Sequence, residues 1–453
     1  MKAILYNYDI FPKVFLGDRR QSVTIQPLGL HAAFEAHKQY VLRIFKVNQS
    51  NPKVYPERSG RSELTVTPDA DGCLRFTAYF EGEGEHFINI YDDPEAKPRL
   101  TLSVYSLSDD MAGRYPLRGD LHMHTCRSDG KESPAVVSAN YRGHGYDFFA
   151  ITDHHRYYPS LEAIAAFGDL TDFVIVPGEE VHLPLNNVHY VNFGGKFSVN
   201  AIVTPSKNQE KAGDDPAWRT MDGTNAPATM TVDEFKAMIE ERANSVPRKN
   251  RSEQLSFAVM QWTHEQVQAA EGLGIFPHPY WLCQMMQLPE DYTEFVYEQA
   301  PFDAFEVLGG ESIYSHNGFQ TGFYYEMKAR GIDHPIVGST DSHGSTEHNK
   351  NGLVCSTIVF APENTREALI DSIKAKYSVA VDSISAEYRL VGDFRFIKYG
   401  SFLMENYFPL HDLVCRAEGY YMKQYATGDS RAEAVLRAMK GQIPDMLKKY
   451  FAL

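Results

Sequence analysis

From residue 120 to residue 130 the chain reads Asp120-Leu121-His122-Met123-His124-Thr125-Cys126-Arg127-Ser128-Asp129-Gly130. Residues i and i+2 of an extended strand point to the same side, so His122 and His124 can bind one ion together. A carboxylate, Asp129, follows five residues after His124. Two imidazoles and a nearby carboxylate indicate a metal site.

Five later stretches carry the same kinds of side chain, and most follow an apolar, strand-like run. They are Thr152–His155, Pro177–Val181, Val188–Tyr190, Phe276–Pro279 and Ser339–His343. The nine candidate ligands in all six stretches are His122, His124, Asp129, His154, Glu180, His189, His278, Asp341 and His343. Strand ends of a parallel barrel converge on one face, so these side chains are expected to meet. Imidazole with carboxylate suits Zn, Mn or Fe better than Ca.

Length, composition and charge narrow the class of protein. The 453 residues are 43% hydrophobic and carry a formal net charge of −15. This length predicts two or three domains with a large buried core. The negative charge makes extended nucleic-acid binding unlikely. A small phosphorylated substrate is still compatible with it, because bound divalent ions reverse the local charge.

The spacing of the cysteines and the lengths of the apolar segments predict a cytoplasmic protein. The five cysteines are scattered without a CxxC pair, which is typical of reduced thiols in a cytoplasmic protein. The first 17 residues are interrupted by polar residues and proline, unlike a signal peptide. The chain has no run of about 18 apolar residues, so no membrane span is expected. Oligomeric state cannot be predicted from these features.

The pattern of elements divides the chain into four parts. Residues 1–108 alternate in short strands with turn signals, which predicts an antiparallel sandwich that serves as a packing or oligomerising module. Residues 109–117 resemble a linker. Residues 118–382 alternate strand and helix, which predicts a parallel α/β domain, open or barrel-shaped. Within it, residues 204–253 are predicted to be an insertion, either a lid or a surface excursion. Residues 383–453 are predicted to be a helical extension.

The motifs of the middle region resemble those of the PHP (polymerase and histidinol phosphatase) superfamily. The matching residues are Asp120–Thr125 with Ser128–Gly130, Ile151–His154, Gly178–Val181, His189, His278–Pro279 and Ser339–His343, in family order over about residues 118 to 382. The resemblance implies a distorted (β/α)7 barrel with a metal-dependent phosphoesterase site. It also implies a cleft that holds three divalent ions of Zn, Mn or Fe.

The resemblance also implies how the ligands are divided among the ions. One ion would be held by His122, His124, Glu180 and Asp341, a second by Asp129, His154 and His343, and a third by Glu180, His189 and His278. Glu180 would bridge, and its neighbour Glu179 would take a supporting or salt-bridging role. Asp129 stands where family members often carry histidine, and a harder ligand there favours Mn or Fe.

The expected reaction is hydrolysis of a phosphomonoester or a short phosphodiester by a hydroxide that two metal ions share. Besides Glu180, the residues predicted to take part in the reaction are His155 and Arg156. His155 is a candidate general acid, or else a packed imidazole. Arg127 and Arg156 are predicted to clamp the phosphate, or else to pair with nearby acids. Asp120 and Asp153 are predicted to orient ligands or to cap loops.

Two alternatives stay open from the residues alone. An amidohydrolase-like enzyme would use a similar site on an amide or lactone, although no lysine lies within the ligand motifs. A non-catalytic metal-binding module would keep the ions without turnover. Tyr280 and Trp281, which follow His278, are predicted either to stack on a substrate ring or to pack in the core.

Overall fold

The computed structural model describes residues 3–29, 31–47, 61–203, 229–283, 285–309, 314–345, 355–383 and 389–453. These fall into two compact units. Unit 1 comprises residues 1–115, 394–414 and 441–453, and unit 2 comprises residues 116–393 and 415–440. The stretch 383–453, expected to be one helical extension, is therefore shared between the two units.

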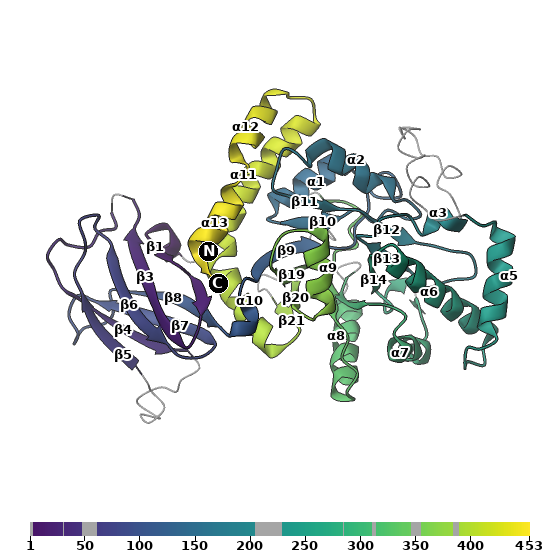
Figure 1. Cartoon of the computed structure of the whole chain (residues 1–453), viewed down its shortest axis with the longest axis horizontal. Helices are drawn as coiled ribbons and strands as arrows, with labels where there is room; N and C mark the ends of the chain where they lie inside the picture. Colours follow the sequence, from purple (N-terminus) through teal and green to yellow (C-terminus); the bar gives the residue numbers. More distant parts are fainter. Residues whose placement is uncertain are drawn as a thin grey trace. The chain divides into compact units, whose positions relative to one another are not determined.

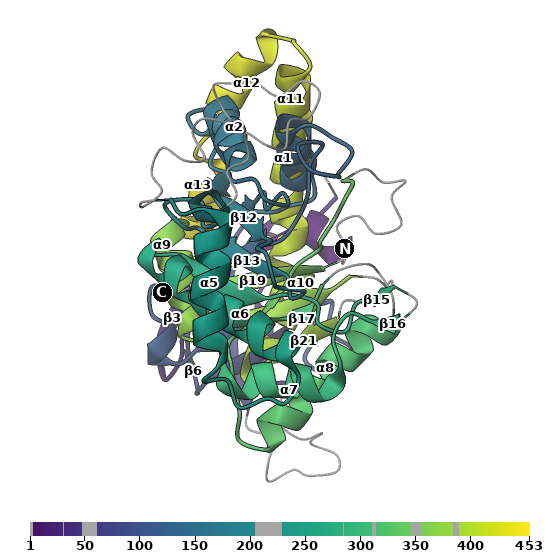
Figure 2. The same ribbon diagram turned by 90° about the vertical axis from the view of Figure 1, so that its right-hand side faces the viewer.

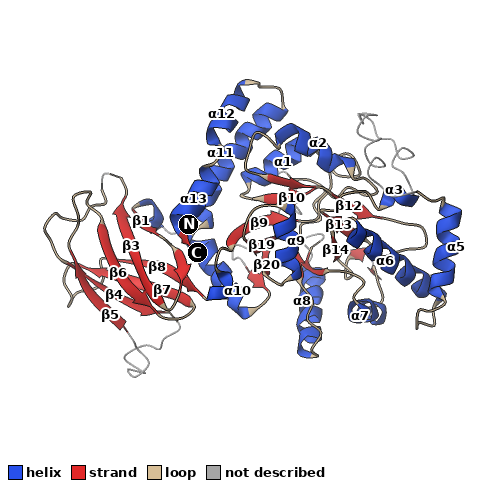
Figure 3. Ribbon diagram, viewed as in Figure 1, coloured by secondary structure: helices blue, strands red, loops and turns tan. Residues whose placement is uncertain are grey.

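Unit 1 is built mainly of two β-sheets (Figures 1 and 3). The smaller sheet is antiparallel, in the order β1 (Tyr8–Phe11), β3 (Arg19–Pro27), β6 (Leu74–Phe80). The larger has the order β22 (Phe451–Ala452), β2 (Val14–Leu16), β8 (Leu100–Leu107), β7 (Gly84–Tyr91), β4 (Tyr40–Lys46), β5 (Arg61–Val66). The short strands expected within residues 1–108 are therefore present as two sheets.

Burial alternates along the strands of unit 1, as expected for sheets with one face in a core. In β6 the residues Leu74, Phe76, Ala78 and Phe80 are buried and those between them are exposed. Side chains of both sheets form one core, among them Ile10, Ile25, Leu74, Leu42, Ile88 and Val104. The two sheets therefore pack face to face, as in a sandwich.

The C-terminal part of the chain completes unit 1. Helix α10 (Phe394–Asn406) places Tyr399 and Phe402 against Tyr105 of β8, with ring centroids 5.0 Å and 5.3 Å apart. Helix α13 (Gln442–Tyr450) leads into β22, which pairs in parallel with β2. A short 3-10 helix, Ala3–Tyr6, precedes β1, and another, Asp109–Met111, follows β8.

Unit 2 is an α/β unit whose strands form two larger sheets and one hairpin. The first sheet has the order β11 (Val174–Val176), β10 (Phe148–Ala150), β9 (Tyr115–Asp120), β19 (Cys355–Ala361), β20 (Ser378–Asp382), β21 (Arg389–Val391). The second has the order β12 (Gly178–Val181), β13 (Tyr190–Phe193), β14 (Leu273–Phe276), β17 (Ala304–Leu308), β18 (Ile336–Gly338). The hairpin is β15 (Leu282–Cys283) with β16 (Met285–Met286).

Helices lie around these strands (Figure 3). They are α1 (Pro134–Gly143), α2 (Tyr158–Phe167), α3 (Asn200–Val203), α5 (Val232–Ala243), α6 (Arg251–Ala269), α7 (Glu290–Gln299), α8 (Tyr314–Ala329), α9 (Arg366–Lys374) and α12 (Arg431–Met439). Helix α11 (Phe408–Ala426) contains the boundary between the units. Among the described helices, none combines the length and the apolar character needed to cross a bilayer.

The expected barrel is not found as one closed sheet among the described residues, since the strands of unit 2 fall into separate sheets. Two isolated bridges nevertheless join the sheets at their ends. Met123, after β9, pairs with Ser342, after β18, and His154, after β10, pairs with Glu180 of β12. The sheets therefore approach each other where the candidate ligands lie.

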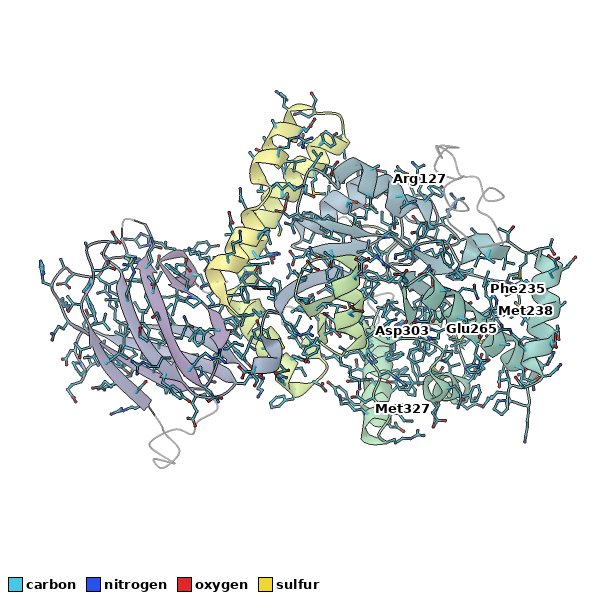
Figure 4. All side chains as sticks on the ribbon, viewed as in Figure 1. Arg127, Phe235, Met238, Glu265, Asp303 and Met327 are labelled. Atoms are coloured by element: carbon cyan, nitrogen blue, oxygen red, sulfur yellow. The ribbon has the colours of Figure 1, made fainter. Side chains whose placement is uncertain are left out.

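The predicted insertion, residues 204–253, is only partly described, because residues 204–228 lie outside the described ranges. Helix α5 begins with a capping box, in which Thr231 and Glu234 satisfy each other's backbone N–H groups. Helices α5 and α6 lie side by side (Figure 2). Phe235 of α5, labelled in Figure 4, packs on Trp262 of α6 with ring centroids 5.1 Å apart. One face of α5, with Phe235, Ile239 and Ala243, is therefore buried against unit 2, while most other residues of this helix are exposed.

Candidate metal centre

The ligand-type side chains follow the ends of several strands of unit 2. His122 and His124 follow β9, His154 follows β10, His278 follows β14, and Asp341 and His343 follow β18. Glu180 lies within β12, and His189 directly precedes β13. Because β12 and β13 are antiparallel, the start of β13 lies beside the end of β12. The strand order thus brings together residues that are far apart in sequence.

Asp120 ties the end of β9 to the end of β18. Its carboxylate accepts hydrogen bonds from Thr340 N at 3.0 Å, Thr340 Oγ1 at 2.6 Å and His122 N at 3.2 Å. The backbone continues this junction, since Asp341 N donates to His122 O at 2.8 Å. Burial raises the pKa of Asp120 to about 6 despite these bonds. Of its two predicted roles, Asp120 therefore caps a loop.

Asp153 does the same for the loop that carries His124 and Asp129. It accepts from Thr125 N at 2.7 Å and from Thr125 Oγ1 at 2.6 Å, and it also binds the Ser128 hydroxyl. A Cβ at Gly130 would lie 2.5 Å from His124 O, so the turn that ends this loop requires glycine. The hydroxyls beside the ligands therefore hold the loop together.

Glu180, and not its neighbour Glu179, faces the imidazoles. Glu180 oxygens lie 2.6 Å from His154 Nδ1 and 2.7 Å from His189 Nδ1. Glu179 accepts from Ser198 Oγ at 2.7 Å, Val199 N at 2.5 Å and Asn192 Nδ2 at 3.1 Å. Adjacent residues of a strand point to opposite faces, which explains why two neighbouring acids have different partners.

All nine predicted ligands are linked through contacts of 3.8 Å or less. Four groups of atoms, from eight of these ligands and from His182, are close enough to hold an ion; His189 belongs to none of the four. They are His124, Asp129, His154 and His343; His122, Glu180 and His278; His122, His124 and Asp341; and His154, Glu180 and His182. The groups share members, so they form one continuous centre.

The spacing of the donor atoms fits bound cations. Two ligand atoms of a tetrahedral ion with bonds of about 2.0–2.1 Å lie roughly 3.3 Å apart. His122 Nε2 lies 3.4 Å from Asp341 Oδ1, and Asp129 Oδ2 lies 3.4 Å from His343 Nε2 and 3.5 Å from His154 Nε2. These separations are longer than ordinary hydrogen bonds. The donor set and its spacing therefore fit divalent metal ions.

The burial and the charges of the candidate ligands also favour bound cations. Both oxygens of Glu180, His122 Nε2 and His189 Nδ1 are buried polar atoms that form no hydrogen bond, although Glu180 lies within ion-pair distance of His154 and His189. Burial opposes the ionised form of Asp341, yet His122 and His124 hold its pKa well below the usual value. Burial likewise opposes the charged form of His154, yet Glu180 and Asp129 raise its pKa to about 11. The carboxylates thus demand positive charge, which protons or cations can provide.

The backbone is also unusual at this place. His155, His278 and Asp341 have positive φ angles of 60°, 27° and 46°. Residues other than glycine seldom adopt such angles, and they cluster at functional sites where the surrounding structure holds them. All three positions either carry a candidate ligand or adjoin one, so the strain coincides with the site.

Two site residues were missed from the sequence. His182 Nε2 lies 2.8 Å from His154 Nδ1 and 3.4 Å from Glu180 Oε2. Its spacing from Glu180 is i+2, the same signal that identified the pair at 122 and 124. The other missed residue is Glu306, whose Oε2 lies 3.0 Å from His122 Nδ1. As a lone acid inside an apolar strand, it gave no local signal.

The two arginines predicted to bind phosphate are engaged in internal contacts. Arg127, labelled in Figure 4, forms a two-point ion pair with Glu162 at 2.9 Å and 3.0 Å. Pairing with an acid was the alternative role expected for this arginine. Arg156 is 1% exposed and donates to the Tyr158 hydroxyl at 2.7 Å. Neither is among the residues that line the cleft. A guanidinium that is paired or buried in this way is not presented to a substrate.

His155 contacts His182, with ring centroids 4.9 Å apart. Burial, followed by the charges of His182 and His154, lowers the pKa of His155 to about 4. The ring is then neutral near pH 7, which disfavours the predicted role as a proton donor. The alternative, a packed imidazole, agrees better with this environment.

A cleft of about 200 Å³ opens onto the centre. It is lined by Asp129, His154, Glu180, His189, His278, Asp341 and His343, and by Trp281. The two aromatic residues after His278 have different environments. Tyr280 is buried against Phe323, with ring centroids 5.6 Å apart, whereas Trp281 forms part of the cleft wall.

No protein-family model matches the chain, and no curated protein matches it. Several solved structures do. A two-domain protein from Bacteroides vulgatus, named as containing a predicted PHP-like metal-dependent phosphoesterase, is 15% identical with a TM-score of 0.37; the match covers 59% of this chain and 65% of that protein. This chain therefore spans less than two thirds of that relative's length.

Two further matches are shorter proteins. One, from Bifidobacterium adolescentis, is named as a candidate metal-dependent phosphoesterase and is 16% identical with a TM-score of 0.32; the match covers 51% of this chain and 89% of that protein. The other, from Chromobacterium violaceum, is named as an amidohydrolase with bound sulfate and no metal. It is 16% identical with a TM-score of 0.31, over 51% of this chain and 88% of that protein. Of these three solved structures, one is thus named for a PHP-like metal-dependent phosphoesterase, one for a metal-dependent phosphoesterase and one for an amidohydrolase.

Proposed function

We propose that this protein is a metal-dependent phosphoesterase that hydrolyses a small phosphomonoester or a short phosphodiester. The observation that carries the proposal is the convergence of the nine predicted ligands into one cluster with metal-compatible spacing, seven of which line one cleft. The proposed ligands are His122, His124, Asp129, His154, Glu180, His189, His278, Asp341 and His343. They would hold up to three ions of Zn, Mn or Fe, with Glu180 shared between two of them.

The barrel predicted from the sequence belongs to the same proposal. Strands β9, β10, β12, β13, β14, β17 and β18 would form a distorted ring of seven strands. Pairing within each sheet and the bridges Met123–Ser342 and His154–Glu180 support this order. Strands β19, β20 and β21 continue the first sheet beyond β9, and Thr357 of β19 and Ser378 of β20 hydrogen-bond to Gly338 and Ile336 of β18.

The residues of the proposed site have different roles in the reaction. Divalent ions bound at the centre would supply water activation near neutral pH and would neutralise phosphate charge. Glu180 and Asp341 provide the negative charge that holds such ions, and burial keeps His124 neutral, with a pKa lowered to about 3. The hydroxyls of Thr125 and Ser128 both bind Asp153 and do not line the cleft, so hydrolysis would proceed without a serine or threonine nucleophile.

The decisive experiment combines elemental analysis with a substrate panel. The purified protein is analysed for Zn, Mn and Fe, stripped with a chelator, and reloaded with each metal. Each form is then given 4-nitrophenyl phosphate, bis(4-nitrophenyl) phosphate, 4-nitrophenyl acetate, an anilide and a lactone.

We expect metal-dependent hydrolysis of one or both phosphate esters, lost on chelation and restored by metal. Turnover of the carboxylic ester, anilide or lactone without the phosphates would replace the proposal with an amidohydrolase-like enzyme. A fully loaded protein that hydrolyses none of the five would instead be a metal-binding module.

A further inference from the structure

Glu306 is a buried carboxylate directly behind the metal centre. It lies in β17, where its neighbours Phe305 and Val307 belong to the hydrophobic core of unit 2. Because side chains alternate along a strand, Glu306 points to the opposite face. Its side chain is 0% exposed, and its Oε2 lies 3.0 Å from His122 Nδ1. The acid therefore faces the ring nitrogen of a candidate ligand.

This contact determines which nitrogen of His122 can bind a cation. A carboxylate accepts hydrogen bonds, so it selects the tautomer in which Nδ1 carries the proton. The lone pair is then on Nε2, which lies 3.6 Å from Glu180 Oε2 and 3.4 Å from Asp341 Oδ1. The nitrogen that lies among the other ligand atoms is thus the one left free to coordinate.

The surrounding structure holds Glu306 in place. Gln320 Nε2 of α8 donates to the backbone carbonyl of Glu306 at 3.1 Å. A Cβ at Gly309 would overlap Glu306 Oε1, so the carboxylate occupies space that only glycine leaves open at that position. Gly309 N in turn donates to Asn317 Oδ1 at 2.9 Å, which fixes the loop after β17.

We propose that Glu306 is a positioning residue that fixes the tautomer and ring orientation of His122 for metal binding. The inference rests on the proposed metal centre but assigns a residue outside the ligand set. Burying a carboxylate is costly unless positive charge compensates it. A cation coordinated by His122 supplies that charge through the ring, so acid, imidazole and cation form one linked unit.

The test compares Glu306→Gln with Glu179→Gln. Both replace a fully buried glutamate of unit 2 without changing its shape, but Glu179 bonds to Ser198, Asn192 and Val199 and not to an imidazole. Glutamine can donate as well as accept, so it no longer selects one tautomer of His122. Metal affinity is measured by competition with a chromophoric chelator, and bound metal is counted by elemental analysis.

We expect Glu306→Gln to weaken the binding of one ion about 10- to 100-fold, which is the usual effect of removing such a partner. Glu179→Gln should keep metal affinity near the wild-type value, because the hydrogen bonds of Glu179 go to Ser198, Asn192 and Val199 and not to a candidate ligand. Phosphatase kcat of Glu306→Gln should largely recover when metal is raised to saturation. If Glu306→Gln does not fold, Glu306→Asp, which retracts the carboxylate from His122, replaces it with the same expectation.

A double-mutant cycle separates positioning from a general structural role. In a His122→Ala background, Glu306→Gln should change metal affinity no further, because the acid acts through that ring. Full wild-type affinity in Glu306→Gln, or an equal loss with and without His122, would overturn the inference. If wild type binds metal but hydrolyses no phosphate ester, the proposed function fails while the role of Glu306 can still be measured.

Discussion

Glu180 is the residue whose replacement should disturb the metal centre most. Its two oxygens lie within 3.6 Å of nitrogens of six histidines, which are His122, His124, His154, His182, His189 and His278. Two of the four ion-holding groups contain Glu180 as their sole carboxylate. Glu180→Gln keeps the shape of the side chain and removes its charge, so it tests the charge itself.

The size of the effect follows from electrostatics. Two unit charges 4 Å apart attract by about 4 kcal/mol at an effective dielectric constant of 20. A cation bound beside Glu180 would lose at least that much, which corresponds to a loss of affinity of roughly 10³-fold. The groups that contain Asp129 or Asp341 keep their own carboxylates and should lose less. Metal content should therefore fall in part and not to zero.

The assay is elemental analysis after gel filtration, with calorimetric titration of metal into the stripped protein. The matched control is Glu179→Gln, which alters the adjacent glutamate on the other face of β12. We expect reduced stoichiometry and weak binding in Glu180→Gln and wild-type values in the control. Wild-type affinity in Glu180→Gln, or an equal loss in both variants, would refute the assignment of Glu180 as the shared ligand.

Three further predictions concern other parts of the molecule. His278→Ala and His122→Ala should each lower metal content and activity, and elemental analysis that found both variants fully loaded would contradict their roles. Glu418→Gln should destabilise the protein by about 3 kcal/mol, because it leaves the buried guanidinium of Arg142, now 2.7 Å from Glu418, less compensated. For a unit of about 300 residues this lowers the melting temperature by about 5 °C, and calorimetry showing a shift below about 1 °C would oppose it. Burial lowers the pKa of His86 from 6.5 to about 4, so its contribution to the stability of unit 1 is complete above pH 6.5 and is lost as the pH falls towards 4. Urea unfolding across this range should show that loss, and His86→Gln should flatten the profile.

The clustering of the candidate ligands was predictable because their signal is local. Each motif places a polar group beside an apolar strand, and strand ends of an α/β fold gather at one face. His182 was equally predictable, because Glu180 and His182 have the same i+2 spacing as the two histidines at 122 and 124. It was missed because that spacing was applied to only one strand.

Other features depend on partners far away in the chain. Arg127 stands beside ligands in sequence, yet its charge is taken by Glu162, which is 35 residues away. Glu306 is 184 residues from His122, so nothing near it indicates its partner. Residues 394–406 form an amphipathic helix, but its place in unit 1 depends on distant partners, as in the packing of Tyr399 and Phe402 on Tyr105. Such pairings follow from the tertiary fold and not from local pattern.

The arrangement of unit 1 has a consequence for synthesis in the cell. Its larger sheet is bordered by β22, made of Phe451 and Ala452, which is translated after all of unit 2. On the ribosome, the first hundred residues therefore emerge long before their last strand and helix α10 exist. Unit 2 begins later in the chain, but most of it, residues 116–393, is synthesised before the C-terminal segments of unit 1. We expect a nascent chain stopped near residue 393 to leave the larger sheet incomplete, with Val14–Leu16 as an exposed edge strand that pairs only with β8.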